Sequence, residues 1–337
     1  MVFEHLFSVD YLKKRPVFLF FLAIAYASIG IAGARLLFGA NSGLVSVFFT
    51  SILLLPTLRK LFSEKSSEIT KKYSIKKLYI KNKDMIWTYF AIFLGIFITY
   101  TLYSFLLPQF GFDTFNIFKE QLFVDPALRG KATFSFGMFT SIFSNNFWVL
   151  LACFILALFT GDGAIFFIAW NASSWGTIFG YRALTGALYN NANPLLYLIL
   201  ILVITFPHFF FESMAYILAA ISGSKISKEI IDSKNAKKFL NVIGYSILIL
   251  AFAYFLLTWV DFTYITIVTI ILSLSLVYGI KTIFEKKKQK TIFFNSYYIL
   301  LVAVIIFILG ALIETIILGN SFTLNKIYNA SYLYGLL

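Results

Sequence analysis

A few polar side chains lie within otherwise apolar stretches of this chain and have the types needed for chemistry. His208 directly follows Pro207, and Glu212 comes four residues later, so a helix places His208 and Glu212 on one face. Asn171 lies in the middle of the preceding apolar stretch. If the two stretches pack as helices, Asn171, His208 and Glu212 reach a similar depth and form a buried polar site. That site would relay protons or bind a ligand, or else form a hydrogen-bond network that holds helices together.

A second polar set is expected near the outer membrane surface. Glu314 lies toward the outer end of the last apolar stretch, and Asn145 and Asn146 start an earlier one. The pattern predicts an outer polar cluster in which asparagine caps the start of a helix. For upright helices that rise about 1.5 Å per residue, Glu314 and Glu212 differ in depth by about 18 Å. The two carboxylates are therefore not expected to pair.

The third feature is the sequence Gly161-Asp162-Gly163, which interrupts an apolar stretch and predicts a turn at the inner surface. It lacks the lysine and the additional glycines of a phosphate-binding loop. Two histidines and the single Cys153 supply too few ligands for a metal site. No pairing of nucleophile and base is visible. The sequence thus predicts no catalytic site, no metal and no cofactor, and the protein is not expected to be an enzyme.

The elements that must position these residues follow from composition. The chain has 337 residues, of which 60% are hydrophobic and 13% charged, against about 25% charged in ordinary soluble domains. A helix needs about 20 apolar residues to cross the hydrocarbon core. Six segments meet this requirement, namely 17–39, 85–108, 195–221, 240–260, 262–281 and 293–319, and the run 43–58 is shorter but uncharged. The expected fold class is an all-α, polytopic membrane protein forming a single domain over residues 1–337.

Basic residues predict the orientation of these spans. Most of the 28 lysines and arginines fall in four regions, residues 13–15, 59–84, 223–238 and 281–290. Because positive residues concentrate on the cytoplasmic side, all four regions are expected there, with 59–84 as a basic cytoplasmic loop and 109–145 as an extracytoplasmic loop. The N-terminus is then cytoplasmic and the C-terminus extracytoplasmic, in the cell membrane.

The region 146–182 must cross the membrane an even number of times to satisfy this orientation. Two short helices, 146–160 and 163–182, meet the condition, and so does a re-entrant pair that enters and leaves on one side. The total is about nine membrane helices, including this pair. The lysine-rich inner face is expected to touch anionic headgroups rather than nucleic acid.

Several segments together resemble a known family. They are the opening MVFEHLFSVDYLKKRPVFLFFLAIAYASIGIA, the central pattern from Asn145-Asn146 through Gly161-Asp162-Gly163 to Trp170-Asn171 and Gly176, the helix PHFFFESMAYILAAISGSKIS, and the closing ILGALIETIILG. This combination resembles the archaeal branch of the stage II sporulation protein M family of integral membrane proteins. One departure is Ala172, where the family pattern has glycine after the asparagine.

The resemblance implies a role in a membrane complex more than an enzymatic one. The bacterial namesake acts in membrane engulfment during spore formation, alongside partners that degrade peptidoglycan. The first hypothesis is therefore a scaffold or partner-binding component of a membrane-organising or remodelling complex, acting with membrane-protein partners or as a homo-oligomer. The alternative is a transporter or channel that uses the buried polar site, with the broken 146–182 segment as its gate.

Overall fold

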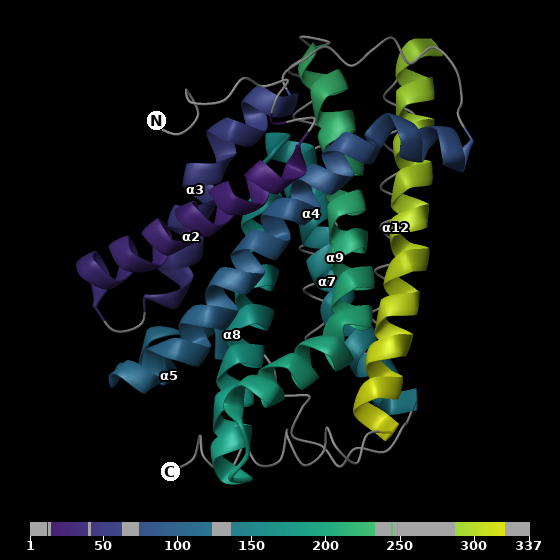
Figure 1. Ribbon diagram of the computed structural model, residues 1–337. Coiled ribbons are helices and arrows are strands. Elements are labelled where there is room, and N and C mark those ends of the chain that lie inside the picture. The colour runs from purple at the N-terminus through teal and green to yellow at the C-terminus, as the bar shows by residue number, and fades with distance from the viewer. Residues whose placement is uncertain are drawn as a thin grey trace.

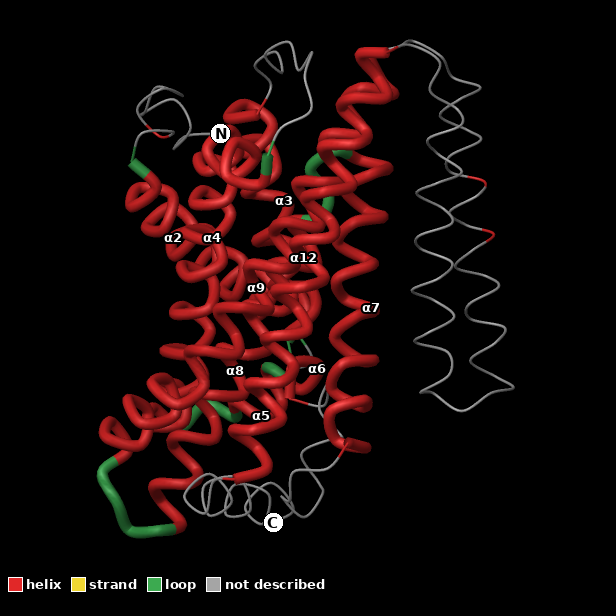
Figure 2. Tube along the Cα trace, turned by 90° about the vertical axis from the view of Figure 1, so that its right-hand side faces the viewer, coloured by secondary structure: helices red, strands yellow, loops and turns green. Residues whose placement is uncertain are grey.

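The computed structural model describes residues 15–39, 42–62, 74–122, 136–232 and 287–320, together with Leu12, Gly244 and Leu248. Throughout these residues the regular structure is helical, without a strand (Figures 1 and 2). The all-helical prediction is confirmed for this part of the chain. The predicted spans 240–260 and 262–281 lie outside it, so the total of about nine membrane helices stays a prediction.

Seven long helices make up the described bundle. They are α2 (Pro16–Phe38), α3 (Gly43–Phe62), α4 (Ile75–Leu106), α7 (Phe136–Thr160), α8 (Ile165–Tyr189), α9 (Pro194–Asp232) and α12 (Lys287–Asn320). Between α4 and α7 lie the short helices η2 (Leu107–Phe110), α5 (Thr114–Ile117) and α6 (Lys119–Leu122). Six of the long helices, all except α8, are long and apolar enough to cross a membrane.

Helix boundaries differ from the sequence prediction mainly by extending further. The helices α3 and α4 run into both ends of the predicted loop 59–84, and α7 begins inside the predicted loop 109–145. The predicted short helices 146–160 and 163–182 are 25 residues each, α7 and α8. For α3 and α4 the physical reason is that hydropathy marks only the lipid-buried part of a helix, whereas hydrogen bonding continues into the boundary region, where polar side chains reach water. The added turns of α7 are mainly apolar and continue the same span.

The long helices pack as neighbours, with α4, α8 and α9 each in contact with several others. The hairpin of α2 and α3 lies against α4 and α8, α4 runs beside α8, and α9 packs against α7, α8 and α12 (Figure 1). Most side chains of α8 are buried, which explains why a helix with several polar residues is stable there. Added Cβ atoms at Gly176 and Gly180 would overlap the main chain of α4, so the two glycines permit this close approach.

Helix α9 is bent. Figure 1 shows its first turns running across the lower end of the bundle before the helix turns upward beside α7 and α12. Pro207 lies inside this helix. A proline removes one backbone donor and clashes with the preceding turn, so we attribute the bend to Pro207.

The helix ends carrying basic residues gather at the upper end of the bundle in Figure 1, where α2, α4 and α12 begin and α3 and α9 end. Each contributes at least one cation, such as Arg15, Arg59, Lys76, Lys228 and Lys290. The turn between α7 and α8 lies at the same end. Its Asp162 interacts electrostatically with Lys228 and Arg59. The fold thus brings basic residues distant in sequence to one end.

Candidate functional site

The structure brings two glutamates together through one asparagine. The side-chain nitrogen of Asn146, on α7, donates to Glu212 Oε1 on α9 at 3.0 Å. The same nitrogen lies 3.4 Å from Glu314 Oε2 on α12. One carboxamide therefore connects three helices. The two carboxylates also interact electrostatically with each other.

Glu212 is the most enclosed member of this cluster. Its side chain is 0% exposed, whereas Asn146 and Glu314 are partly buried. An added Cβ at Gly310 would lie 2.8 Å from Glu212 Cγ. The absence of a side chain at Gly310 is therefore what lets α12 close over the glutamate. We call Asn146, Glu212 and Glu314 the three-helix cluster.

The expectation that Glu212 and Glu314 lie too far apart to pair is wrong. It assumed upright helices aligned at the midpoints of their apolar segments. The first turns of α9 instead run across the end of the bundle (Figure 1), and Pro207, to which we attribute the bend, lies five residues before Glu212. This change of direction places Glu212 nearer the end of the bundle that also holds Glu314.

The expected capping role for asparagine is also wrong. Helix α7 starts at Phe136, so Asn145 and Asn146 lie more than two turns inside it. Asn145 is exposed, and its side-chain nitrogen is 3.5 Å from Asn146 Oδ1. The two neighbours therefore differ in role, because only Asn146 points between the helices.

His208 lies among aromatic rings. The centroid of its ring is 6.2 Å from that of Trp175 and 6.4 Å from that of Phe179, both on α8. The adjacent Phe209 stacks on Phe97 of α4, with centroids 4.9 Å apart. His208 is 6% exposed. It therefore helps to join α9 to α8 within an aromatic cluster.

Asn171 is also buried, but its amide serves its own helix. Asn171 Nδ2 donates to the backbone oxygen of Phe167, one turn earlier, at 2.8 Å. Among the described residues, no hydrogen bond joins any two of Asn171, His208 and Glu212. The predicted grouping of these three residues is therefore not found. Of the three, only Glu212 belongs to the three-helix cluster.

Two residues that the sequence reasoning did not single out belong near this cluster. Tyr216 follows Glu212 by one turn, is 1% exposed, and its hydroxyl interacts with the Glu212 carboxylate. Its four-residue spacing was a readable signal. Gly310 gave no such sequence signal, because its role depends on which helix faces it.

The turn joining α7 to α8 lies at the opposite, basic end. Gly161 has φ +78, a left-handed conformation that glycine adopts without the usual steric cost. The backbone N–H of Gly163 donates to Thr160 Oγ1 at 2.8 Å. Burial raises the pKa of Asp162 above its ordinary value, while the charges of Lys228 and Arg59 partly oppose that rise.

The three-helix cluster has two possible chemical uses. Two carboxylates near one amide repel each other in a low-dielectric environment unless a proton or a cation lies between them. With that charge compensated, the cluster ties helices together. If the compensating proton or cation exchanges with solvent, the cluster is a binding site. No group of three or more His, Cys, Asp or Glu side chains suited to a metal ion occurs among the described residues.

Comparison with known proteins gives one match. The family model described as Stage II sporulation protein M matches residues 85–260, which run from α4 through α9 and include Asn146 and Glu212. Glu314 lies beyond the matched range. No curated protein and no solved structure matches the chain. Because the matched range covers more than half of the 337 residues, the chain belongs to the stage II sporulation protein M family.

Proposed function

We propose that this protein is a multi-pass scaffold of the cell membrane, a partner-binding component of a complex that organises or remodels the bilayer. The whole chain forms one membrane domain, with the N-terminus in the cytoplasm and the C-terminus outside. It acts without catalysis. Within its family we place it in the archaeal-type branch, because of the segments quoted from both ends of the chain.

The observation that carries this proposal is the tie between α7, α9 and α12. A carboxamide hydrogen bond of 3.0 Å to a fully buried carboxylate, closed over by Gly310, fixes three helices relative to one another. Further ties join other helices. Ser104 Oγ donates to Thr177 O between α4 and α8, and Ser222 Oγ donates to Ser296 O between α9 and α12, each at 2.8 Å. A rigid bundle of this kind suits a platform for other proteins.

The basic end supports a second part of the proposal, namely contact with anionic headgroups at the cytoplasmic face. Exposed lysines occur at the start of α4, such as Lys76, Lys77 and Lys83. Each basic residue near an anionic surface contributes about 1 kcal/mol of attraction. We further propose that its partners are other membrane proteins or a second copy of the chain.

The test is reconstitution of the full chain into liposomes, read out by vesicle shape and by ion flux. For a scaffold we expect assemblies of protein and altered vesicle outlines in electron micrographs, without proton or cation flux above that of empty vesicles. Asn146→Ala should weaken assembly, whereas the exposed neighbour change Asn145→Ala should leave it intact. Round vesicles that carry dispersed single molecules would contradict the proposal.

One observation favours the second candidate, a transporter or channel. The second oxygen of Glu212, Oε2, is buried without a hydrogen-bond partner among the described residues. A buried carboxylate oxygen of this kind is suited to hold a transferable proton. If this function holds, flux appears in the same vesicles and Glu212→Gln abolishes it, while Asn145→Ala does not. Flux unchanged by Glu212→Gln would remove this candidate.

A further inference from the structure

The two carboxyl groups of the three-helix cluster meet at a single amide. Asn146 Nδ2 is 3.0 Å from Glu212 Oε1 and 3.4 Å from Glu314 Oε2. The two glutamates also lie within hydrogen-bonding reach of each other. Two ionised carboxylates have no hydrogen atom to place between them, whereas a carboxylic acid can donate to a carboxylate. A direct hydrogen bond between the two glutamates therefore needs a proton on one of them.

Burial assigns that proton to Glu212. Its side chain is 0% exposed, whereas Glu314 is partly buried and lies six residues before the end of α12, about 9 Å of helix. A negative charge costs more at the fully enclosed position. Glu212 Oε2 is also buried without a hydrogen-bond partner among the described residues. An ionised oxygen at this place needs a donor, whereas a protonated one needs only an acceptor.

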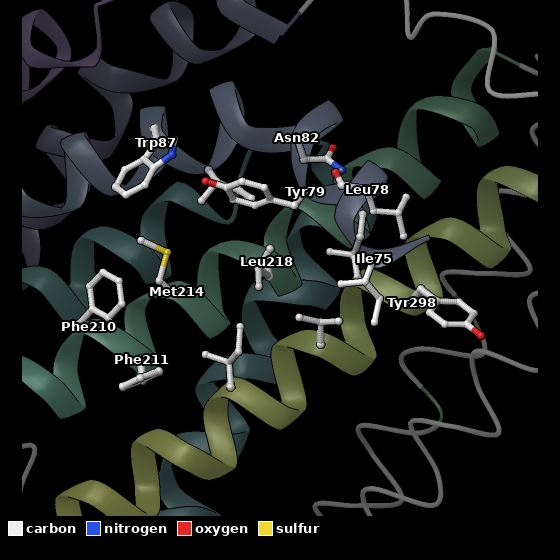
Figure 3. A pocket seen from close by; sticks show the side chains of 14 residues that line it. Ile75, Leu78, Tyr79, Asn82, Trp87, Phe210, Phe211, Met214, Leu218 and Tyr298 are labelled. Carbon is white, nitrogen blue, oxygen red and sulfur yellow. The ribbon is translucent and has the colours of Figure 1, made fainter. Parts of the chain in front are cut away.

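The helices packed around Glu212 present aromatic and aliphatic groups to it. On α9, Phe211 and Met214 flank Glu212 in the sequence and line an apolar groove between α4, α9 and α12 (Figure 3). In the described part of the chain, the lining of this groove contains no charged side chain. Toward α8, the centroid of the Tyr216 ring is 6.3 Å from that of Trp175. These surroundings favour the neutral form of a buried carboxyl group.

The titratable groups that act on this site carry no positive charge. Glu314 of α12 and Tyr216 of α9 interact with Glu212, and Cys153 of α7 interacts with Tyr216. His208, one turn before Glu212, packs against the aromatic rings of α8. The low dielectric of the interior strengthens the repulsion between two carboxylates. A proton on one carboxyl group removes that repulsion.

We propose that Glu212 is a proton-binding site, which holds one proton at neutral pH and donates it in a hydrogen bond to ionised Glu314. This bond joins α9 to α12 beside Gly310. Because Glu314 is the less enclosed partner, the proton enters and leaves past its carboxylate. That this side is extracytoplasmic rests on the proposed orientation. The proton site itself goes beyond the proposed function, since it holds for a scaffold and for a transporter alike.

The test is infrared spectroscopy of the purified full chain in a detergent without ester groups, with and without isotopically labelled glutamate. At neutral pH we expect the C=O stretching band of one protonated glutamic acid, which shifts with the label and on transfer to heavy water. Glu212→Gln should abolish this band. Glu314→Gln removes the neighbouring charge, so the band should disappear at a pH lower by about one unit.

Glu120→Gln is the matched control. Glu120 Oε2 is likewise buried without a hydrogen-bond partner among the described residues, but Glu120 lies on α6, outside the three-helix cluster. This variant should retain the full band. A band that persists in Glu212→Gln, or that is lost in Glu120→Gln, would overturn the proposal.

The native protein supplies a test that needs no variant. Absence of any glutamic acid band at neutral pH would overturn the proposal, and an unfolding temperature that then rises with sodium would assign a cation in place of the proton. Neither vesicle shape nor flux enters these measurements. Failure of the scaffold proposal therefore leaves this result unaffected.

Discussion

The carboxamide of Asn146 and the carboxylate of Glu212 meet at 3.0 Å across the contact between α7 and α9. The same carboxamide nitrogen lies within 3.4 Å of Glu314 on α12. Its neighbour in the sequence, Asn145, is exposed on the surface of α7. Two adjacent and chemically identical residues thus differ in what they hold together, which makes them a natural matched pair.

Asn146→Ala should lower the free energy of unfolding by about 1–3 kcal/mol, because it leaves a buried carboxylate without its donor. Thermal unfolding of the purified protein in detergent measures this. The control Asn145→Ala removes an equal number of atoms and should change stability by less than about 0.5 kcal/mol. An equal decrease in the free energy of unfolding in both variants would mean that the three-helix cluster contributes nothing specific to stability.

Gly176→Ala and Gly180→Ala should each destabilise the packing of α8 on α4, because the new methyl group would overlap the α4 backbone. We expect each substitution to lower the free energy of unfolding by about 1–3 kcal/mol, measured by thermal unfolding in detergent. Gly33→Ala on α2 is the comparison, since its Cβ would meet Phe49 at an ordinary 3.6 Å. That variant should be neutral or slightly more stable, owing to the better helix propensity of alanine.

Asp162→Asn should change how stability depends on pH. Burial raises the pKa of Asp162 above its ordinary 3.8 in the folded protein, so the folded state holds a proton that the unfolded state has lost. The stability of the native protein therefore falls as pH rises from 3.8 through the raised value. Because the amide of the variant does not titrate, its free energy of unfolding should match that of the native protein below pH 3.8 and exceed it at neutral pH. A less stable variant at neutral pH would show that Lys228 and Arg59 outweigh the desolvation.

Single cysteines test the orientation. In a Cys153→Ala background, Lys60→Cys, Lys83→Cys and Lys290→Cys should all react with an impermeant maleimide from the cytoplasmic side of membrane vesicles. Asn191→Cys, in the turn between α8 and α9, should react only from the other side. Reaction of Lys60→Cys and Lys290→Cys from opposite sides would contradict the inside placement of the basic residues.

Sequence reasoning predicted the helical elements well because hydropathy and length determine which segments are energetically tolerated in lipid. It placed a turn at Gly161-Asp162-Gly163, where the structure has the connection between α7 and α8. It did not locate the ends of α3 and α4, since polar residues continue these helices beyond the apolar core without a sequence break. It also placed the start of α7 too late, at Asn146 instead of Phe136.

The candidate site was only partly accessible to such reasoning. Each member of the three-helix cluster could be recognised as a polar residue in an apolar segment, yet their grouping could not. Depth along a straight helix paired Glu212 with His208 and Asn171, whereas the direction of α9 and the close approach of α12 at Gly310 decided the actual contact. Both are relations between helices, which a single sequence does not encode in a readable pattern.

The bend in α9 also resolves a mismatch of length. A straight helix of 39 residues would span about 58 Å, nearly twice the roughly 30 Å hydrocarbon thickness. With its first turns lying across the end of the bundle, the segment keeps Leu195, Leu196 and Val203 58%, 64% and 66% exposed. An apolar surface that lies flat at that level is suited to the interface between lipid and water. It would fix the depth of the whole bundle in the bilayer.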